Sequence, residues 1–133
     1  MHWKHSPAQL LPSVIVGIAI LWLTLSPNPV PSAEMLFVGQ DKVAHAVMFL
    51  VWTLLICRDL RGYGRKPNPW LAALFATAVG ALIEVLQWSM DLGRSAEWLD
   101  LAADAAGAAI AAAVFPMLTR HRLPTPRHRN DRH

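Results

Sequence analysis

The stretch that decides the fold is WLAALFATAVGALIEVLQWSM, residues 70–90, in which Glu84 is the only ionisable side chain. A run of about 20 predominantly apolar residues is long enough to cross the hydrocarbon core of a bilayer as an α-helix. Pro67 and Pro69 stand directly before the run, where a proline costs little because the first N–H groups of a helix have no partner within it. The stretch therefore predicts a membrane-spanning helix from Trp70 to Met90.

Three further apolar runs accompany this one. They cover residues 10–25 (at most 8–26), residues 43–57, whose first turn can begin at Asp41, and the alanine-rich residues 98–118. The chain is 54% hydrophobic and 16% charged, whereas a soluble domain carries about 25% charged residues. We therefore predict an all-α fold, an integral membrane bundle of about four transmembrane helices.

The basic residues predict the orientation of this bundle. Ten of the twelve Lys and Arg residues precede the first run, lie between the second and third, or follow the fourth, and only Lys42 and Arg94 lie on the other side. Loops rich in Lys and Arg stay in the cytoplasm, so both termini are predicted to be cytoplasmic. We expect residues 1–118 to form the membrane domain and residues 119–133 a basic, disordered cytoplasmic tail.

The first run has a rival interpretation as a cleaved signal peptide, since a basic segment precedes an apolar one. The best cleavage point follows Ala33, and there Pro31 occupies a position that requires a small residue. We therefore interpret the run as a retained span.

Composition narrows the chemistry. A single cysteine, Cys57, excludes an intrachain disulfide and a thiolate zinc site. The net charge of +3 comes from basic residues beside apolar runs, a placement that suits lipid headgroups rather than nucleic acid. We expect no cofactor and no metal, because a site built from His45, Glu84 and Asp104 would be poor in nitrogen ligands.

Polar residues gather at one level of the predicted bundle. Ionisable groups inside a membrane are costly and require a partner or a purpose, and Glu84 lies more than one helical turn inside its run. Gln87 follows on the same helical face. The second run begins at the same level in an antiparallel neighbour and brings Asp41, Lys42 and His45 to it.

The fourth run starts at this level too. Residues 93–95, Gly-Arg-Ser, predict a turn with Ser95 as the N-cap and Glu97 in the first helical turn, where an acidic residue favours the helix dipole. Helical spacing then aligns a stripe of residues that are polar in the first turns and have small side chains in the later ones. This stripe is predicted to be a packing face. Its members are Glu97, Asp100, Asp104, Gly107 and Ala111, and Ala103 flanks them.

These residues predict a pocket open to the outside of the cell. The ligand-binding candidates are Asp41, Lys42, His45, Glu84, Gln87, Arg94, Asp100 and Asp104. The inner half of the membrane has almost no ionisable side chains, whereas a continuous ion path would need them there. A channel across the bilayer is therefore disfavoured.

The order of three short motifs resembles that of the VanZ-like membrane proteins. DKVAH (41–45), EVLQ (84–87) and RSAEWLD (94–100), the last followed by Asp104 and Gly107, carry a resemblance that covers roughly residues 41–113. It implies a small multi-pass protein of the bacterial cytoplasmic (inner) membrane, in a family whose founding member is associated with teicoplanin resistance. The characteristic positions carry over, except that Asp104 stands where the family often has Asn.

Three functions stay open at this point. In the first, the pocket binds a cell-envelope component such as a lipid-linked precursor, a lipid headgroup or a lipoglycopeptide drug. Lys42 and Arg94 would hold phosphate, while the carboxylates and Gln87 would take hydroxyl or amide groups.

In the second, the protein is a membrane-embedded hydrolase or transferase acting on a lipid-linked substrate. The catalytic candidates are His45, Glu84 and Asp100. His45 or Glu84 would be the general base, oriented by Asp100 or Asp104.

In the third, the cluster has no function beyond structure and only ties helix ends together. Its ion pairs would be those of Arg94 with Asp100 or Glu97 and of Lys42 with Asp41 or Glu84.

Overall fold

The computed structural model describes residues 6–26, 37–90 and 97–120. The elements are a short 3-10 helix η1 (Pro7–Leu10) and the α-helices α1 (Leu11–Leu25), α2 (Gln40–Gly62), α3 (Pro69–Met90) and α4 (Trp98–Arg120). All regular structure in the described residues is helical. Four helical segments, of which the first joins η1 to α1, are long and apolar enough to cross a membrane. The predicted all-α, four-helix membrane bundle is thus confirmed.

The helices match the apolar runs closely, apart from two longer ends. The predicted end of the second run at Cys57 is wrong, because α2 continues through Arg58, Asp59 and Arg61 to Gly62. Asp59 is only 3% exposed, and its carboxylate accepts a hydrogen bond of 2.8 Å from the amide of Ser13 in α1. This hydrogen bond attaches the polar last turns of α2 to α1.

The end of α2 is set by a glycine. Gly64 adopts a positive φ of 82°, and the amide of Arg65 bonds the carbonyl of Leu60 at 2.9 Å, which closes the helix with a left-handed turn. The carboxamide oxygen of Asn68 then accepts from the amides of Trp70 and Leu71 and caps α3. α4 runs to Arg120, so the predicted tail begins inside the helix, and the rest of it lies outside the described residues.

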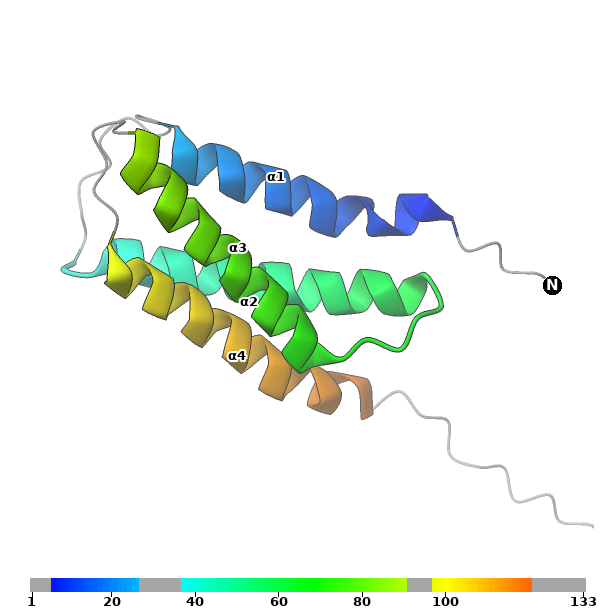
Figure 1. Ribbon diagram of the computed structural model, residues 1–133. Coiled ribbons are helices and arrows are strands. Elements are labelled where there is room, and N and C mark those ends of the chain that lie inside the picture. The colour runs from blue at the N-terminus through cyan, green and yellow to red at the C-terminus, as the bar shows by residue number, and fades with distance from the viewer. Residues whose placement is uncertain (1–5, 27–36, 91–96, 121–133) are drawn as a thin grey trace, which may run out of the picture.

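The four helices run antiparallel to their neighbours in the chain (Figure 1). α2 packs most extensively against α4, α3 packs against both, and α1 contacts α2 and α3 but not α4 within the described segments. The first turn of α1, the α2–α3 connection and the last turn of α4 share one end of the bundle. The starts of α1 and α3 therefore lie at the same end of the bundle as the ends of α2 and α4.

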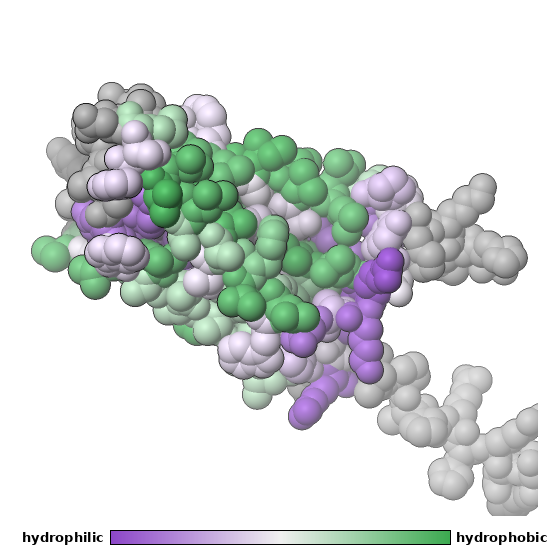
Figure 2. Space-filling model, viewed as in Figure 1, coloured by the Kyte–Doolittle hydropathy of each residue, from purple (hydrophilic) through white to green (hydrophobic). Residues whose placement is uncertain are grey.

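Hydrophilic residues gather at the two ends of the bundle, separated by an apolar belt (Figure 2), and the sequence gives the two ends different charges. We call one the basic end; its described residues are Arg58, Arg61, Arg65, Lys66 and Arg120. We call the other the acidic end; its described residues include Asp41, Glu97 and Asp100. Large apolar side chains stay exposed around the belt, such as Ile18 at 60% and Leu74 at 64%, as expected for surfaces that face lipid.

Small residues let α2 and α4 approach closely. A Cβ atom built on Gly107 would lie 2.0 Å from the carbonyl oxygen of Ala46, so the two backbones are in contact there. Ala108, Ala111 and Ala112 continue this face and are at most 1% exposed. The small-residue stripe is therefore a packing face, as the sequence predicts, and its partner is α2 of the same bundle.

The tight contact at Gly107 yields a stability prediction. Gly107→Ala should force α2 and α4 apart and lower the free energy of unfolding by about 3 kcal/mol, the scale of a severe overpacking change. We expect a lower thermal midpoint and a lower yield of monodisperse protein in detergent. Gly62→Ala is the matched control, because its new Cβ would meet no side chain closer than 3.6 Å; equal losses in both variants would contradict the contact.

Candidate functional site at the acidic end

The ammonium group of Lys42 joins the start of α2 to the start of α4. Its Nζ atom lies 2.7 Å from Oδ2 of Asp41 and 2.8 Å from Oδ1 of Asp100, and it also bonds Oε2 of Glu97. Gly39, with a positive φ of 86°, is the N-cap residue of α2, the helix that carries Lys42. Of the ion pairs predicted for Lys42, the structure shows the one with Asp41.

A histidine and an aspartate meet one turn deeper. Nδ1 of His45 lies 2.9 Å from Oδ1 of Asp104, and its Nε2 lies 3.8 Å from Oδ2 of Asp100. Asp104 is 2% exposed. Gly80 of α3 leaves room for its carboxylate, because a Cβ there would stand 2.8 Å from Oδ2. Three helices thus enclose the pair, and Asp104 rather than Asp100 is bonded to the imidazole.

Glu84 ties α3 to the start of α4. Its Oε2 atom accepts a hydrogen bond of 2.9 Å from the amide of Glu97, and the residue is 5% exposed. The carbonyl of Glu97 accepts from the amide of Asp100 at 2.9 Å, which places Glu97 at the N-cap position of α4. The prediction that Glu97 lies in the first turn is wrong, because α4 begins at Trp98. Ser95, the predicted N-cap, lies outside the described residues.

Two predicted site residues stand apart from these bonds. Nε2 of Gln87 donates to the carbonyl of Thr24 at 2.7 Å, so this amide nitrogen serves the contact between α3 and α1. Arg94 lies outside the described residues. The six remaining candidates and Glu97 form what we call the acidic cluster: Asp41, Lys42, His45, Glu84, Glu97, Asp100 and Asp104.

The carboxylates of Asp41, Glu97 and Asp100 are close enough together to hold a cation. One oxygen from each lies within 4.8 Å of the others. The ammonium group of Lys42 already bonds all three. This part of the cluster is therefore an internal ion-pair network, with Lys42 as its cation.

A cavity of about 420 Å³ adjoins the cluster between α3 and α4. Among the described residues, Glu84 is the ionisable side chain in its wall, and the rest of the described lining is apolar or aromatic: Ala81, Val85, Trp88, Trp98 and Leu101. The two tryptophans are 77% and 83% exposed. Indole rings favour the membrane interface, so this cavity is suited to a molecule that is apolar over most of its surface.

Sequence reasoning missed Gly80 and Asp59 and did not place Glu97 among the site residues. Gly80 stands one turn before Glu84 on the same face, and that spacing was the available signal. Asp59, in the sequence Arg-Asp-Leu-Arg, is an acidic residue within a basic stretch. Nothing local shows that its carboxylate reaches Ser13.

The comparison with known proteins agrees with these motifs. A family model described as VanZ/LLP1 matches residues 6–119. The chain belongs to the VanZ/LLP1 family. The match takes in every member of the acidic cluster and nearly all of the four helices, and it confirms the resemblance seen in the sequence. No curated protein and no solved structure matches the chain of this VanZ/LLP1 protein.

The Lys42 network yields a second stability prediction. Lys42→Met should lower the thermal midpoint, because three neighbouring carboxylates would lose the ammonium group that all of them bond. Adding Glu97→Gln should restore part of the loss by removing one negative charge. Lys66→Met, at the basic end, is the control and should change the midpoint little. An unchanged midpoint in Lys42→Met would show that the network contributes nothing.

Proposed function

We propose that the acidic end faces the outside of the cell and binds the head group of an amphiphilic cell-envelope component. The observation that carries the proposal is the cavity between α3 and α4, in which the carboxylate of Glu84 meets walls of tryptophan and aliphatic side chains. An amphiphile can place its apolar part against Trp88 and Trp98 while its polar part reaches the acidic cluster.

The charge distribution supports this orientation. Of the Lys and Arg residues that the structure describes at the two ends of the bundle, Lys42 alone lies at the acidic end and five lie at the basic end. Basic segments remain on the cytoplasmic side. The acidic cluster would then face the space in which cell-wall assembly takes place, in a bacterial inner membrane.

The cluster favours a head group that donates hydrogen bonds. Its five carboxylates outnumber the cationic groups Lys42 and His45, even with the imidazole protonated. Lys42 already serves three of them, so it is less suited to phosphate than the sequence suggests. Hydroxyl, amide or ammonium groups of a lipid-linked cell-wall precursor or a lipoglycopeptide fit better. Binding of this kind would account for a role in teicoplanin-type resistance.

A second function is favoured by the His45–Asp104 pair. When Nδ1 donates its hydrogen to Asp104, Nε2 carries the lone pair and can accept a proton from water. The protein would then hydrolyse or transfer a group of a lipid-linked substrate. Turnover of a lipid-linked precursor in vesicles, lost in His45→Gln, would favour this enzyme function over binding alone.

The binding proposal is tested with Glu84→Gln. The variant keeps the shape of the side chain and an oxygen that can accept from the amide of Glu97, so folding should be spared while the charge in the cavity wall is lost. We expect about tenfold weaker binding of teicoplanin or of a lipid-linked cell-wall precursor to the protein in nanodiscs, because a charge-assisted hydrogen bond is removed.

The control is Ser89→Ala, which lies on the exposed face of α3 and outside the cavity lining. Its affinity and its thermal midpoint should match the wild type. Wild-type protein that binds neither probe, or equal affinities in Glu84→Gln and Ser89→Ala, would refute the proposed site. A collapse of the thermal midpoint in Glu84→Gln would support the purely structural interpretation instead.

The orientation has a separate test in a Cys57→Ser background. Asp41→Cys, at the acidic end, should react with a membrane-impermeant maleimide in intact cells. Arg120→Cys, at the basic end, should react only after the cells are lysed. Each variant is the control for the other, and the reverse pattern would place the acidic cluster in the cytoplasm.

A further inference from the structure

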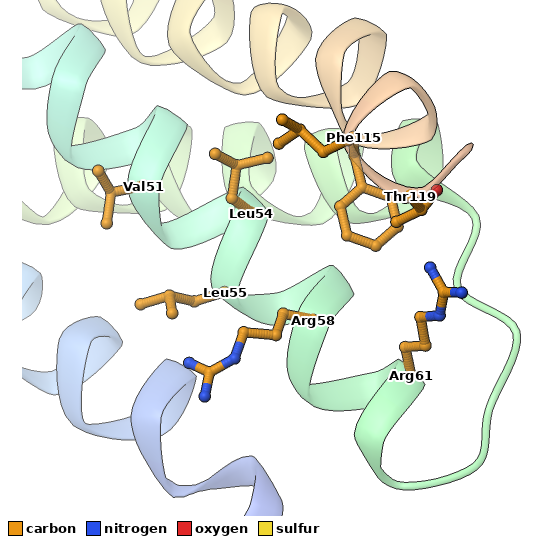
Figure 3. Close-up of a pocket in the computed structure, with 8 residues that line it drawn as sticks. Val51, Leu54, Leu55, Arg58, Arg61, Phe115 and Thr119 are labelled. Atoms are coloured by element: carbon orange, nitrogen blue, oxygen red, sulfur yellow. The ribbon is translucent and has the colours of Figure 1, made fainter. Parts of the chain in front are cut away.

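A groove lies between α2 and α4 at the basic end and has a volume of about 580 Å³ (Figure 3). Val51, Leu54 and Leu55 of α2 line its apolar part, together with Leu118 of α4. The same face of α2 continues into Arg58 and Arg61, which line the groove near the end of the helix. The groove is therefore apolar along its length and cationic at one end.

The two arginines have no counter-charge in the described part of the chain. No carboxylate there lies within ion-pair distance of the guanidinium of Arg58 or Arg61. Asp59 stands between them in sequence, but its Oδ2 atom bonds the amide of Ser13. In Figure 3 the side chain of Arg61 points toward Thr119, while that of Arg58 runs past Leu55. The two guanidinium groups therefore point apart at the edges of the groove, each with its charge available.

The cationic end opens into a second cavity of about 500 Å³. Arg61, Phe115 and Thr119 line both spaces, and Arg65 and Lys66 are added in the second. The positive charge thus increases from the apolar groove toward the α2–α3 connection. A head group in this second cavity would meet three basic side chains.

We propose that the groove binds one anionic phospholipid, with its phosphate at Arg61, where the two spaces meet, and an acyl chain along Val51, Leu54 and Leu118. Arg58 is a second cation at the edge of the groove. Val51 is 42% and Leu118 55% exposed, on helices that span the bilayer, so lipid has direct access. Guanidinium groups bind phosphate oxygens in a bidentate manner, and basic pockets between membrane helices suit anionic head groups. A zwitterionic head group would bring a further positive charge close to four basic side chains, those of Arg58, Arg61, Arg65 and Lys66.

The proposal is tested with full-length protein by native mass spectrometry, titrated with phosphatidylglycerol or phosphatidylcholine of the same chain length. Wild-type protein should prefer phosphatidylglycerol by about tenfold or more. Arg58→Gln with Arg61→Gln should reduce the preference to less than about twofold. Arg120→Gln removes a positive charge at the same end, outside both cavities, and should keep the preference.

Two results overturn the proposal: no head-group preference in wild-type protein, or the same loss in Arg120→Gln as in the double variant, which would mean diffuse attraction to the basic end. If the double variant does not fold, wild-type protein is labelled in vesicles with a photoactivatable phosphatidylglycerol. Crosslinks should then map to residues 51–61 and 115–119, and crosslinks elsewhere would refute the groove. The acidic end plays no part in this measurement, so its outcome is independent of the function proposed above.

Discussion

The contact between the backbones of α2 and α4 at Ala46 and Gly107 is the constraint on which the rest of the structure depends. With no side chain at Gly107, the carbonyl of Ala46 can approach α4 directly. His45 adjoins Ala46, and Asp104 lies one turn before Gly107, so the same register brings the imidazole and the carboxylate to 2.9 Å. A further turn toward the acidic end, Lys42 meets Asp100. The register of one helix pair therefore determines which charged groups can bond.

The acidic cluster reconciles a high density of charge with an apolar environment. Burying an unpaired carboxylate is costly, and Asp104 and Glu84 are only 2% and 5% exposed. Asp104 is bonded to the imidazole of His45, and Glu84 accepts from the amide that precedes α4. Since a helix N-terminus presents unbonded N–H groups and a positive dipole end, it can satisfy a buried carboxylate without a second ionic side chain. The start of α4 is therefore both a structural joint and part of the candidate site.

Sequence alone could predict whatever depends on local patterns. The four spans follow from hydropathy, and the shared level of Asp41, His45, Glu84 and Asp100 follows from antiparallel runs with a known rise per residue. The packing role of Gly107 follows from helical period. These features need no knowledge of the partner residue.

Apart from Gly80, whose spacing from Glu84 was a local signal, the missed features depend on which groups meet across helices. The stretch after Cys57 is polar, so nothing in its own composition extends α2; the amide of Ser13 in α1 holds Asp59. Glu97 takes the N-cap position of α4 instead of lying in its first turn as predicted, and the carboxylate of Glu84 in α3 accepts a hydrogen bond from its amide. Gln87 shares a face with Glu84, yet its amide nitrogen bonds α1 rather than the cluster. The periodicity of a helix predicts on which face a side chain lies, but not which group on a neighbouring helix it will bond.

The size of the residues along α4 explains why its open spaces lie at its two ends. Packed helices cross at an angle and separate away from their point of closest approach. Around that point α4 carries Gly107, Ala108, Ala111 and Ala112, which are buried and leave little room for a ligand. The larger side chains that line the openings stand near the ends, Trp98 beside the cavity at Glu84 and Phe115 beside the groove at Arg61. Close packing midway along α4 therefore leaves two lateral openings, one between α3 and α4 next to a carboxylate and one between α2 and α4 next to guanidinium groups. Because each opening combines an apolar wall with charge of one sign, the two ends of the same helix are suited to amphiphiles with opposite head-group chemistry.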